Sequence, residues 1–128
     1  MRISLTQGAI AALEAERRRR GPDAVELEHD AFLVFGGMGP CRYITRAGRF
    51  LVGKDEFWDV PVLREAEDRE AVASLRGAAR RLSLPELLTF IPPKPPEAVV
   101  CDGCEGSGWS AHMPAVVCLA CGGMGWHR

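Results

Sequence analysis

The chain has 128 residues, of which 47% are hydrophobic and 26% are charged, and its formal net charge at pH 7 is −1. The composition is that of a globular protein, and the length excludes two full-sized domains. The near-neutral charge gives no overall attraction to nucleic acid or to an anionic membrane surface, and no stretch approaches the roughly 20 apolar residues of a membrane span.

The N-terminal sequence lacks the apolar core of a signal peptide. Four of the five cysteines stand in closely spaced pairs, which favours metal binding in a reducing compartment over a disulfide framework. We therefore expect a cytoplasmic protein.

Residues 4–20 have the pattern of a helix. Ser4 can cap its N-terminus with Gln7 three residues on, and Gly21-Pro22 would end it. The four arginines at 17–20 suit the negative end of the helix dipole, and two of them, Arg18 and Arg20, follow Glu14 and Glu16 by four residues. We interpret them as a solvated helix end, with nucleic-acid binding through Arg17, Arg18, Arg19 and Arg20 as the alternative.

Residues 24–35 alternate between apolar and polar side chains, which predicts one long strand or two strands bent near 28–30. Segments 42–45 and 49–52 predict a hairpin with Gly48 in the left-handed position of the turn. Together these segments predict a small antiparallel sheet of three or four strands.

Three further features belong to the same region. The glycine-rich stretch 36–40 is predicted to form a turn, and Phe57-Trp58 an aromatic anchor for the sheet. Cys41 has no histidine or other base near it in the sequence, so we interpret it as a partly buried thiol rather than a nucleophile.

Residues 64–82 predict a second helix that covers the sheet with one apolar face, formed by Val72, Leu75, Ala79 and Leu82. The segment Ser83-Leu84-Pro85-Glu86 has the pattern of a capping box and predicts a short helix that runs through Phe90. Prolines at 92–96 then favour a stiff, extended spacer.

The sequence therefore predicts three segments. They are an α+β domain over residues 1–91, in which helices cover a small antiparallel sheet, a proline-rich linker over 92–98, and a C-terminal module over 99–128.

Two copies of one eleven-residue motif form that module, at residues 99–109 and 116–126. Both read V-V-C-x-x-C-x-G-x-G-W, and seven of the eleven positions are identical at a spacing of 17 residues. This identity indicates an internal repeat rather than a chance pair of cysteine doublets. Its cysteines are Cys101, Cys104, Cys118 and Cys121.

Two thiolates three residues apart can bind one metal from a tight turn, and two such turns supply the four sulfurs of a closed tetrahedral zinc site. The glycines after each pair let backbone N–H groups approach the sulfurs. The valines before each pair and the Gly-x-Gly-Trp after it predict that each copy is a β-hairpin. Four cysteines favour structural zinc, although His112 or His127 could replace one of them in a catalytic site that keeps a position for water.

The motif resembles the cysteine-rich zinc-finger region of the DnaJ (heat-shock forty) co-chaperones, whose hallmark is repeated C-x-x-C-x-G-x-G. The resemblance covers about thirty of the 128 residues, and the His-Pro-Asp motif of the J-domain is absent. That family carries four copies that pair into two zinc sites, so two copies imply one zinc ion per chain. The resemblance also implies a fold for the tail and binding of protein segments.

The tail is predicted to bind a protein rather than nucleic acid. The fixed charges of residues 101–128 sum to −1, and a zinc ion with four thiolates adds −2. A negative tail repels phosphate, whereas Trp109 and Trp126 offer apolar area with a hydrogen-bonding group to a protein partner.

No Ser-His-Asp or paired-carboxylate arrangement is recognisable in the first ninety residues. We therefore expect a non-enzymatic adaptor or regulatory protein. Thiol–disulfide exchange by the C-x-x-C pairs is the enzymatic alternative, although the sequence lacks the βαβ pattern in which such redox sites occur.

Overall fold

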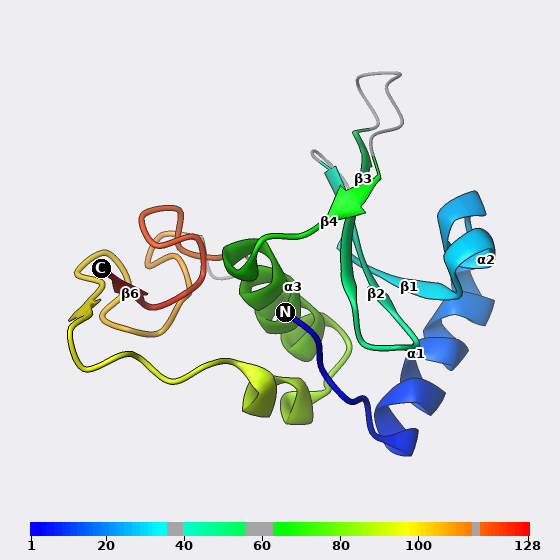
Figure 1. The fold of residues 1–128 in the computed structure, drawn as a ribbon, viewed down its shortest axis with the longest axis horizontal. Coiled ribbons are helices and arrows are strands. Elements are labelled where there is room, and N and C mark those ends of the chain that lie inside the picture. Colours follow the sequence, from blue (N-terminus) through cyan, green and yellow to red (C-terminus); the bar gives the residue numbers. More distant parts are fainter. Residues whose placement is uncertain (36–39, 56–62, 114–115) are drawn as a thin grey trace. The chain divides into compact units, whose positions relative to one another are not determined.

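The computed structural model describes residues 1–35, 40–55, 63–113 and 116–128. They form two compact units, Met1–Ala66 and Glu67–Arg128. The first unit contains α1 (Gln7–Arg20), α2 (Ala24–His29), β1 (Ala31–Phe35), β2 (Pro40–Thr45), β3 (Phe50–Asp55) and β4 (Arg64–Glu65) (Figure 1). The second contains α3 (Asp68–Arg81), the 3-10 helix η1 (Pro85–Phe90), β5 (Val99–Val100) and β6 (Trp126–His127).

The four strands of the first unit form an antiparallel sheet in the order β1-β2-β3-β4. The predicted α+β class and the small antiparallel sheet are therefore confirmed. No helix in the described part of the chain combines the length and the apolar character that a membrane span requires.

Helix α1 begins later than predicted. Its N-cap is Thr6, whose hydroxyl accepts a 3.1 Å hydrogen bond from the backbone N–H three residues on, so the prediction of Ser4 as the cap is wrong. The backbone N–H of Ile3 donates to the carbonyl of Gly48 at 2.9 Å, and this bond ties the segment before the helix to the turn at Gly48. The predicted end of the helix at Gly21, with φ 84°, is confirmed.

Three of the arginines that end α1 form ion pairs within the first unit: Arg17 with Asp30, Arg19 with Glu16, and Arg20 with Glu26. The guanidinium of Arg17 also lies 4.6 Å from the centre of the Phe32 ring. The carboxylate of an ion pair offsets the charge of its arginine, so a paired arginine attracts a phosphate less strongly. These contacts give the arginine run a structural role.

The predicted strand at 24–35 is wrong over its first half, which forms helix α2. Asp23 and Glu26 make a reciprocal capping box at the start of this helix, and Asp30 ends it in the left-handed conformation with φ 47°. Local capping thus overrides the alternating pattern. The second half of the segment forms β1 as predicted.

The predicted β2–β3 hairpin is confirmed, with Gly48 at φ 84° in its turn. Cys41 on β2 is buried in a cluster with Ala31, Tyr43 and Leu51, as expected for a structural thiol. Of the remaining features predicted here, residues 36–39 of the glycine-rich turn and the pair Phe57-Trp58 lie outside the described residues.

Helix α3 begins at Asp68 rather than at residue 64, because Arg64 and Glu65 pair with β3 as the edge strand β4. On its predicted apolar face, Val72, Leu75 and Ala79 are buried and Leu82 is partly buried. The prediction of a capping box at Ser83 is wrong. Ser83 has φ 54°, the N-cap of η1 is Leu84 without a side-chain hydrogen bond, and the helix is of the 3-10 type.

The two compact units divide between Ala66 and Glu67, ahead of α3, and not in the predicted proline-rich linker at 92–98. The reason lies in the second unit, where Val72 of α3 shares one buried cluster with the four cysteines of the repeat. Helix α3 therefore belongs to the same compact unit as the C-terminal module. This packing positions the candidate site.

Candidate metal centre

The four cysteines of the repeat converge on one point. Their sulfur atoms all lie within 4.8 Å of one another, and all four side chains are buried. The Sγ atoms are 3.9 Å apart between Cys101 and Cys118, and 3.7 Å apart between Cys104 and Cys121. In a tetrahedral zinc site with Zn–S bonds of about 2.3 Å, the sulfurs are roughly 3.8 Å apart. The four cysteines can therefore hold one metal ion.

The two copies of the repeat pair with each other. Strand β5, at the start of the first copy, pairs with β6, at the end of the second, and Trp109 forms a bridge with Val117. The N–H of Cys101 donates to Gly125 O at 3.0 Å, and the equivalent bond from Cys118 to Gly108 O is 2.9 Å long. The prediction of a separate hairpin in each copy is wrong, because the entering segment of one copy pairs with the leaving segment of the other.

Each copy also places a backbone N–H on a cysteine sulfur. Gly108 donates to Cys104 Sγ at 3.3 Å, and Gly125 donates to Cys121 Sγ at 3.2 Å. Both glycines have positive φ, 80° and 89°, which other residues rarely adopt. The predicted role of the glycines in bringing N–H groups to the sulfurs is thus confirmed, and these bonds stabilise thiolate charge.

The neighbouring sulfurs of Cys104 and Cys121, 3.7 Å apart, influence each other's ionisation. Burial opposes ionisation of Cys104, but the Gly108 N–H and the neighbouring sulfurs of Cys121 and Cys101 lower its pKa to about 7. Burial raises the pKa of Cys121 to about 11 although the backbone N–H groups of Gly125 and Gly123 act to lower it, and the sulfurs of Cys104 and Cys118 act in the same direction as burial. Ionisation of one thiol thus disfavours that of the other. A bound cation removes this conflict by stabilising both thiolates.

Helix α3 forms one side of the centre, which the sequence analysis missed. Arg76 donates from Nε to Gly123 O and from Nη2 to Met124 O, the latter at 3.3 Å. A Cβ at Gly123 would lie 3.3 Å from Ala73, so the turn approaches the helix closely. The available signal was the series of cationic residues on one helical face, since Arg69, Arg76 and Arg80 are seven and four residues apart.

The predicted partner residues lie on the same unit. Trp126 is partly buried and packs against the cysteine cluster, and its Nε1 is buried without a hydrogen-bond partner among the described residues. Trp109 is partly buried under Arg80, whose guanidinium carbon is 3.5 Å from the ring centre. His112 and His127 are exposed and do not belong to the cluster.

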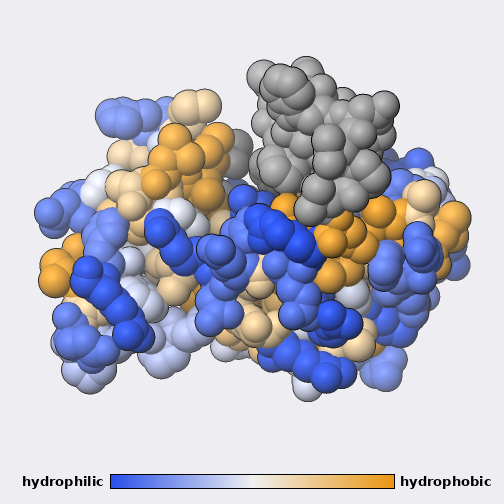
Figure 2. Space-filling view, turned by 45° about the horizontal axis from the view of Figure 1, so that its top comes forward, coloured by the Kyte–Doolittle hydropathy of each residue, from blue (hydrophilic) through white to orange (hydrophobic). Residues whose placement is uncertain are grey.

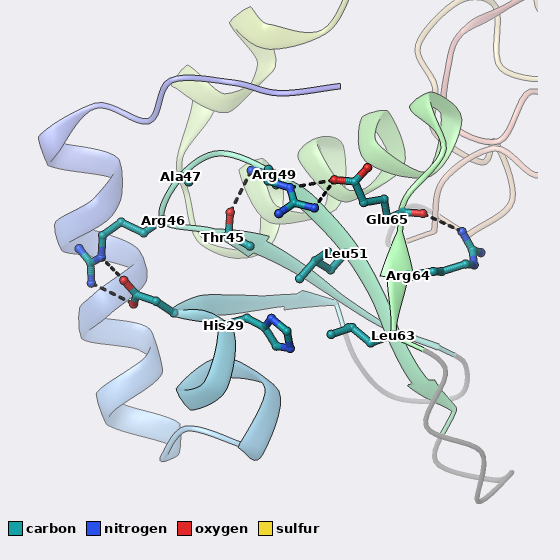
Figure 3. Close-up of a pocket in the computed structure, with 10 residues that line it drawn as sticks. His29, Thr45, Arg46, Ala47, Arg49, Leu51, Leu63, Arg64 and Glu65 are labelled. Carbon is teal, nitrogen blue, oxygen red and sulfur yellow. Dashed lines mark hydrogen bonds and ion pairs between the residues drawn. The ribbon is translucent and has the colours of Figure 1, made fainter.

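The first unit contains a pocket of about 600 Å³ beside the β2–β3 turn (Figure 3). Its charged walls are paired internally, since Arg46 binds Asp30 and Arg49 binds Glu65. The guanidinium of Arg46 holds the pKa of Asp30 below its usual value. This pairing leaves the cysteine cluster as the stronger candidate for chemistry.

Comparisons with family models, with curated proteins and with solved structures find no match.

The conformation of Gly108 leads to a test with an internal control. Gly108→Ala should destabilise the metal-loaded second unit by at least ~1–2 kcal/mol, because an L-residue is strained at positive φ. A Cβ there would also overlap the Arg76 guanidinium and lie 2.7 Å from Gly123 O. Thermal unfolding of the zinc-loaded chain measures the effect.

The control is Gly103→Ala. The second copy carries Ala120 at the equivalent position, and the nearest atom to a Cβ at Gly103 is 3.4 Å away. The midpoint of thermal unfolding of this variant should equal that of the wild type. Equal stability of Gly108→Ala and Gly103→Ala would contradict the role given to the left-handed glycine.

Proposed function

We propose that this chain binds one zinc ion through Cys101, Cys104, Cys118 and Cys121, and that it acts as a non-enzymatic adaptor or regulatory protein. In this proposal, the module at 99–128 is a DnaJ-like zinc module that binds a protein partner. The observation that carries the proposal is the convergence of four buried sulfurs, each within 4.8 Å of the others, from two copies of one motif. Four thiolates suit zinc and close its coordination sphere.

A structural role for the zinc is supported by its surroundings. The four sulfurs are buried, and Val72, Met124 and partly buried Trp126 pack against them. Catalytic zinc needs an open position for water or substrate, which four thiolates in an apolar cluster do not offer. The metal would instead stabilise the fold of the module and the surface that it presents.

Metal content is the first measurement. Chain prepared under reducing conditions should be heavier by one zinc ion in a native mass spectrum than in a denaturing one. A zinc-free native spectrum, or disulfides between the four cysteines in protein kept reduced, would overturn the proposal. Cobalt substitution supplies a second readout, since a tetrahedral tetrathiolate site binds Co²⁺ with the same ligands.

Two features favour a protein as the partner. The charge of residues 101–128 with zinc bound is negative, which repels phosphate. The module also exposes apolar side chains outside the cysteine cluster, with Leu119 86% and Val99 64% exposed. Figure 2 shows that hydrophobic areas, in orange, lie between hydrophilic residues on one face of the molecule. Exposed apolar side chains and tryptophan are typical of protein interfaces.

Partner binding is tested at Trp109, because Trp126 packs against the cysteine cluster and its truncation would disturb the metal site. Trp109→Ala should retain zinc and weaken partner binding by 2 kcal/mol or more, roughly thirtyfold. Pull-down from a native extract, followed by titration of the retained protein, measures the loss. The control is Leu88→Ala, which removes an exposed apolar side chain of η1.

Retention of the same proteins by wild type and Trp109→Ala, at equal zinc content, would contradict the role of this tryptophan. Salt-sensitive retention of nucleic acid by the wild type would contradict the choice of a protein partner.

A further inference from the structure

Arg76 connects helix α3 to both copies of the repeat. Its guanidinium donates to the carbonyls of Gly123 and Met124 in the second copy. In the first copy, a Cβ at Gly108 would overlap the same guanidinium. The side chain therefore lies where the two turns meet, and glycines at both places allow the approach.

The two carbonyls belong to the turn that follows Cys121 in the second copy. They lie between Cys121 and Gly125, whose N–H donates to the Cys121 sulfur at 3.2 Å. By fixing the carbonyl of Gly123 and that of Met124, Arg76 restrains the turn that aims this N–H at the sulfur. Orientation of ligands by surrounding hydrogen bonds is a general determinant of metal affinity.

The charge of the guanidinium matters as much as its hydrogen bonds. A zinc ion with four thiolates has a net charge of −2, which is costly in a buried cluster unless a positive charge lies close by. Burial lowers the pKa of Arg76, and the neighbouring sulfurs of Cys121 and Cys104 act against that shift. The guanidinium thus lies within the electrostatic reach of two of the four sulfurs.

We propose that Arg76 is an outer-sphere group of the zinc site, whose positive charge offsets the negative zinc–thiolate cluster and sets its affinity for the metal. The inference rests on the proposed zinc binding and extends it. The metal-binding unit then includes helix α3, and it begins upstream of the repeat itself. Arg76 is a positioning residue, since it acts through the cysteines and their turn.

The test uses the full-length chain and three variants, with zinc affinity measured by competition against a chromogenic chelator. Arg76→Gln removes the charge and keeps an amide donor, whereas Arg76→Lys keeps the charge. The matched control is Arg80→Gln, which removes the same charge one turn along α3, where the guanidinium lies over Trp109. We expect zinc affinity to fall about 10–100-fold in Arg76→Gln, and to stay within about twofold of the wild type in Arg80→Gln.

Arg76→Lys should bind zinc more tightly than Arg76→Gln, and the Co²⁺ spectrum of each variant should keep the tetrahedral tetrathiolate bands of the wild type. Equal affinities of Arg76→Gln and Arg80→Gln would overturn the inference, as would a lysine variant no tighter than the glutamine variant. These results require a wild type that binds one zinc ion. A wild type without zinc would overturn the proposed function itself, so the two failures are distinguishable.

Discussion

Replacement of Cys101 by serine is expected to abolish tight zinc binding and to unfold the C-terminal module. Cys101 is fully buried, and its sulfur lies 3.9 Å from that of Cys118. Three remaining thiolates leave the coordination sphere open. Zinc binding contributes roughly 10–16 kcal/mol to the folding of structural zinc peptides. A module of this size buries too little apolar surface to make up for the loss of that free energy.

The expected readouts are the loss of zinc from the native mass spectrum and the loss of dispersed amide resonances from residues 99–128. Cys41→Ser is the matched control, because Cys41 lies in the other compact unit and outside the cysteine cluster. It should keep a full complement of zinc.

The same variant separates the zinc proposal from disulfide exchange. A redox C-x-x-C pair would lose reductase activity on replacement of Cys101, while the tail would keep its fold, because a catalytic thiol is not needed for stability. A folded Cys101→Ser tail with lost reductase activity would therefore contradict the structural zinc site. We expect an unfolded tail and no reductase activity in the wild type.

The cysteine cluster was the most predictable part of the molecule. A repeat at a fixed spacing identifies equivalent positions without reference to the fold. The clustering of Cys101, Cys104, Cys118 and Cys121 and the glycines that donate the N–H···S bonds could therefore be predicted from the sequence. The pairing of the strands did not follow. A repeat indicates that two segments are alike. It does not indicate whether the strands within one copy pair with each other or with the strands of the other copy.

The errors in the rest of the fold have one local and one long-range cause. The alternation at 24–35 contains Glu26 as a polar position, but this side chain is fully buried. The Asp23–Glu26 capping box was also present in the sequence and outweighs the alternation. The role of α3 was missed because Val72 and Arg76 show only that the helix is amphipathic. Which surface covers its apolar face depends on packing between residues distant in the chain.

The buried carboxylate of Glu26 leads to the largest effect expected in the first unit. Its side chain is fully buried and accepts hydrogen bonds from Arg20 at 2.8 and 3.2 Å, from Leu33 N at 2.9 Å and from Asp23 N at 3.1 Å. It joins the end of α1, the cap of α2 and the strand β1. Glu26→Ala would leave the guanidinium and the backbone N–H groups without their acceptor.

Breaking a buried ion pair on one side typically costs about 3–5 kcal/mol, a large share of the stability of a small domain. We therefore expect Glu26→Ala to lower the midpoint of urea unfolding strongly, as followed by circular dichroism of the full-length, zinc-loaded chain. Glu28→Ala is the control, because Glu28 is an exposed residue of the same helix. Equal midpoints for the two variants would show that Glu26 is not a structural centre of this unit.

The pH dependence gives an independent check of the same carboxylate. Burial opposes ionisation of Glu26, but the hydrogen bonds from Arg20, Leu33 and Asp23 prevail and lower its pKa below the ordinary value. Its stabilising contribution is therefore fully present above the pKa of the unfolded chain, and it is lost as the pH falls through the lower pKa of the folded state.

The wild type should lose stability with acidification in this range, and Glu26→Gln should lose less, because its side chain does not titrate. Urea midpoints measured between about pH 3 and pH 6, a range around the usual glutamate pKa, provide the comparison. Parallel pH profiles for wild type and Glu26→Gln would show that this carboxylate does not contribute to the acid sensitivity of the fold.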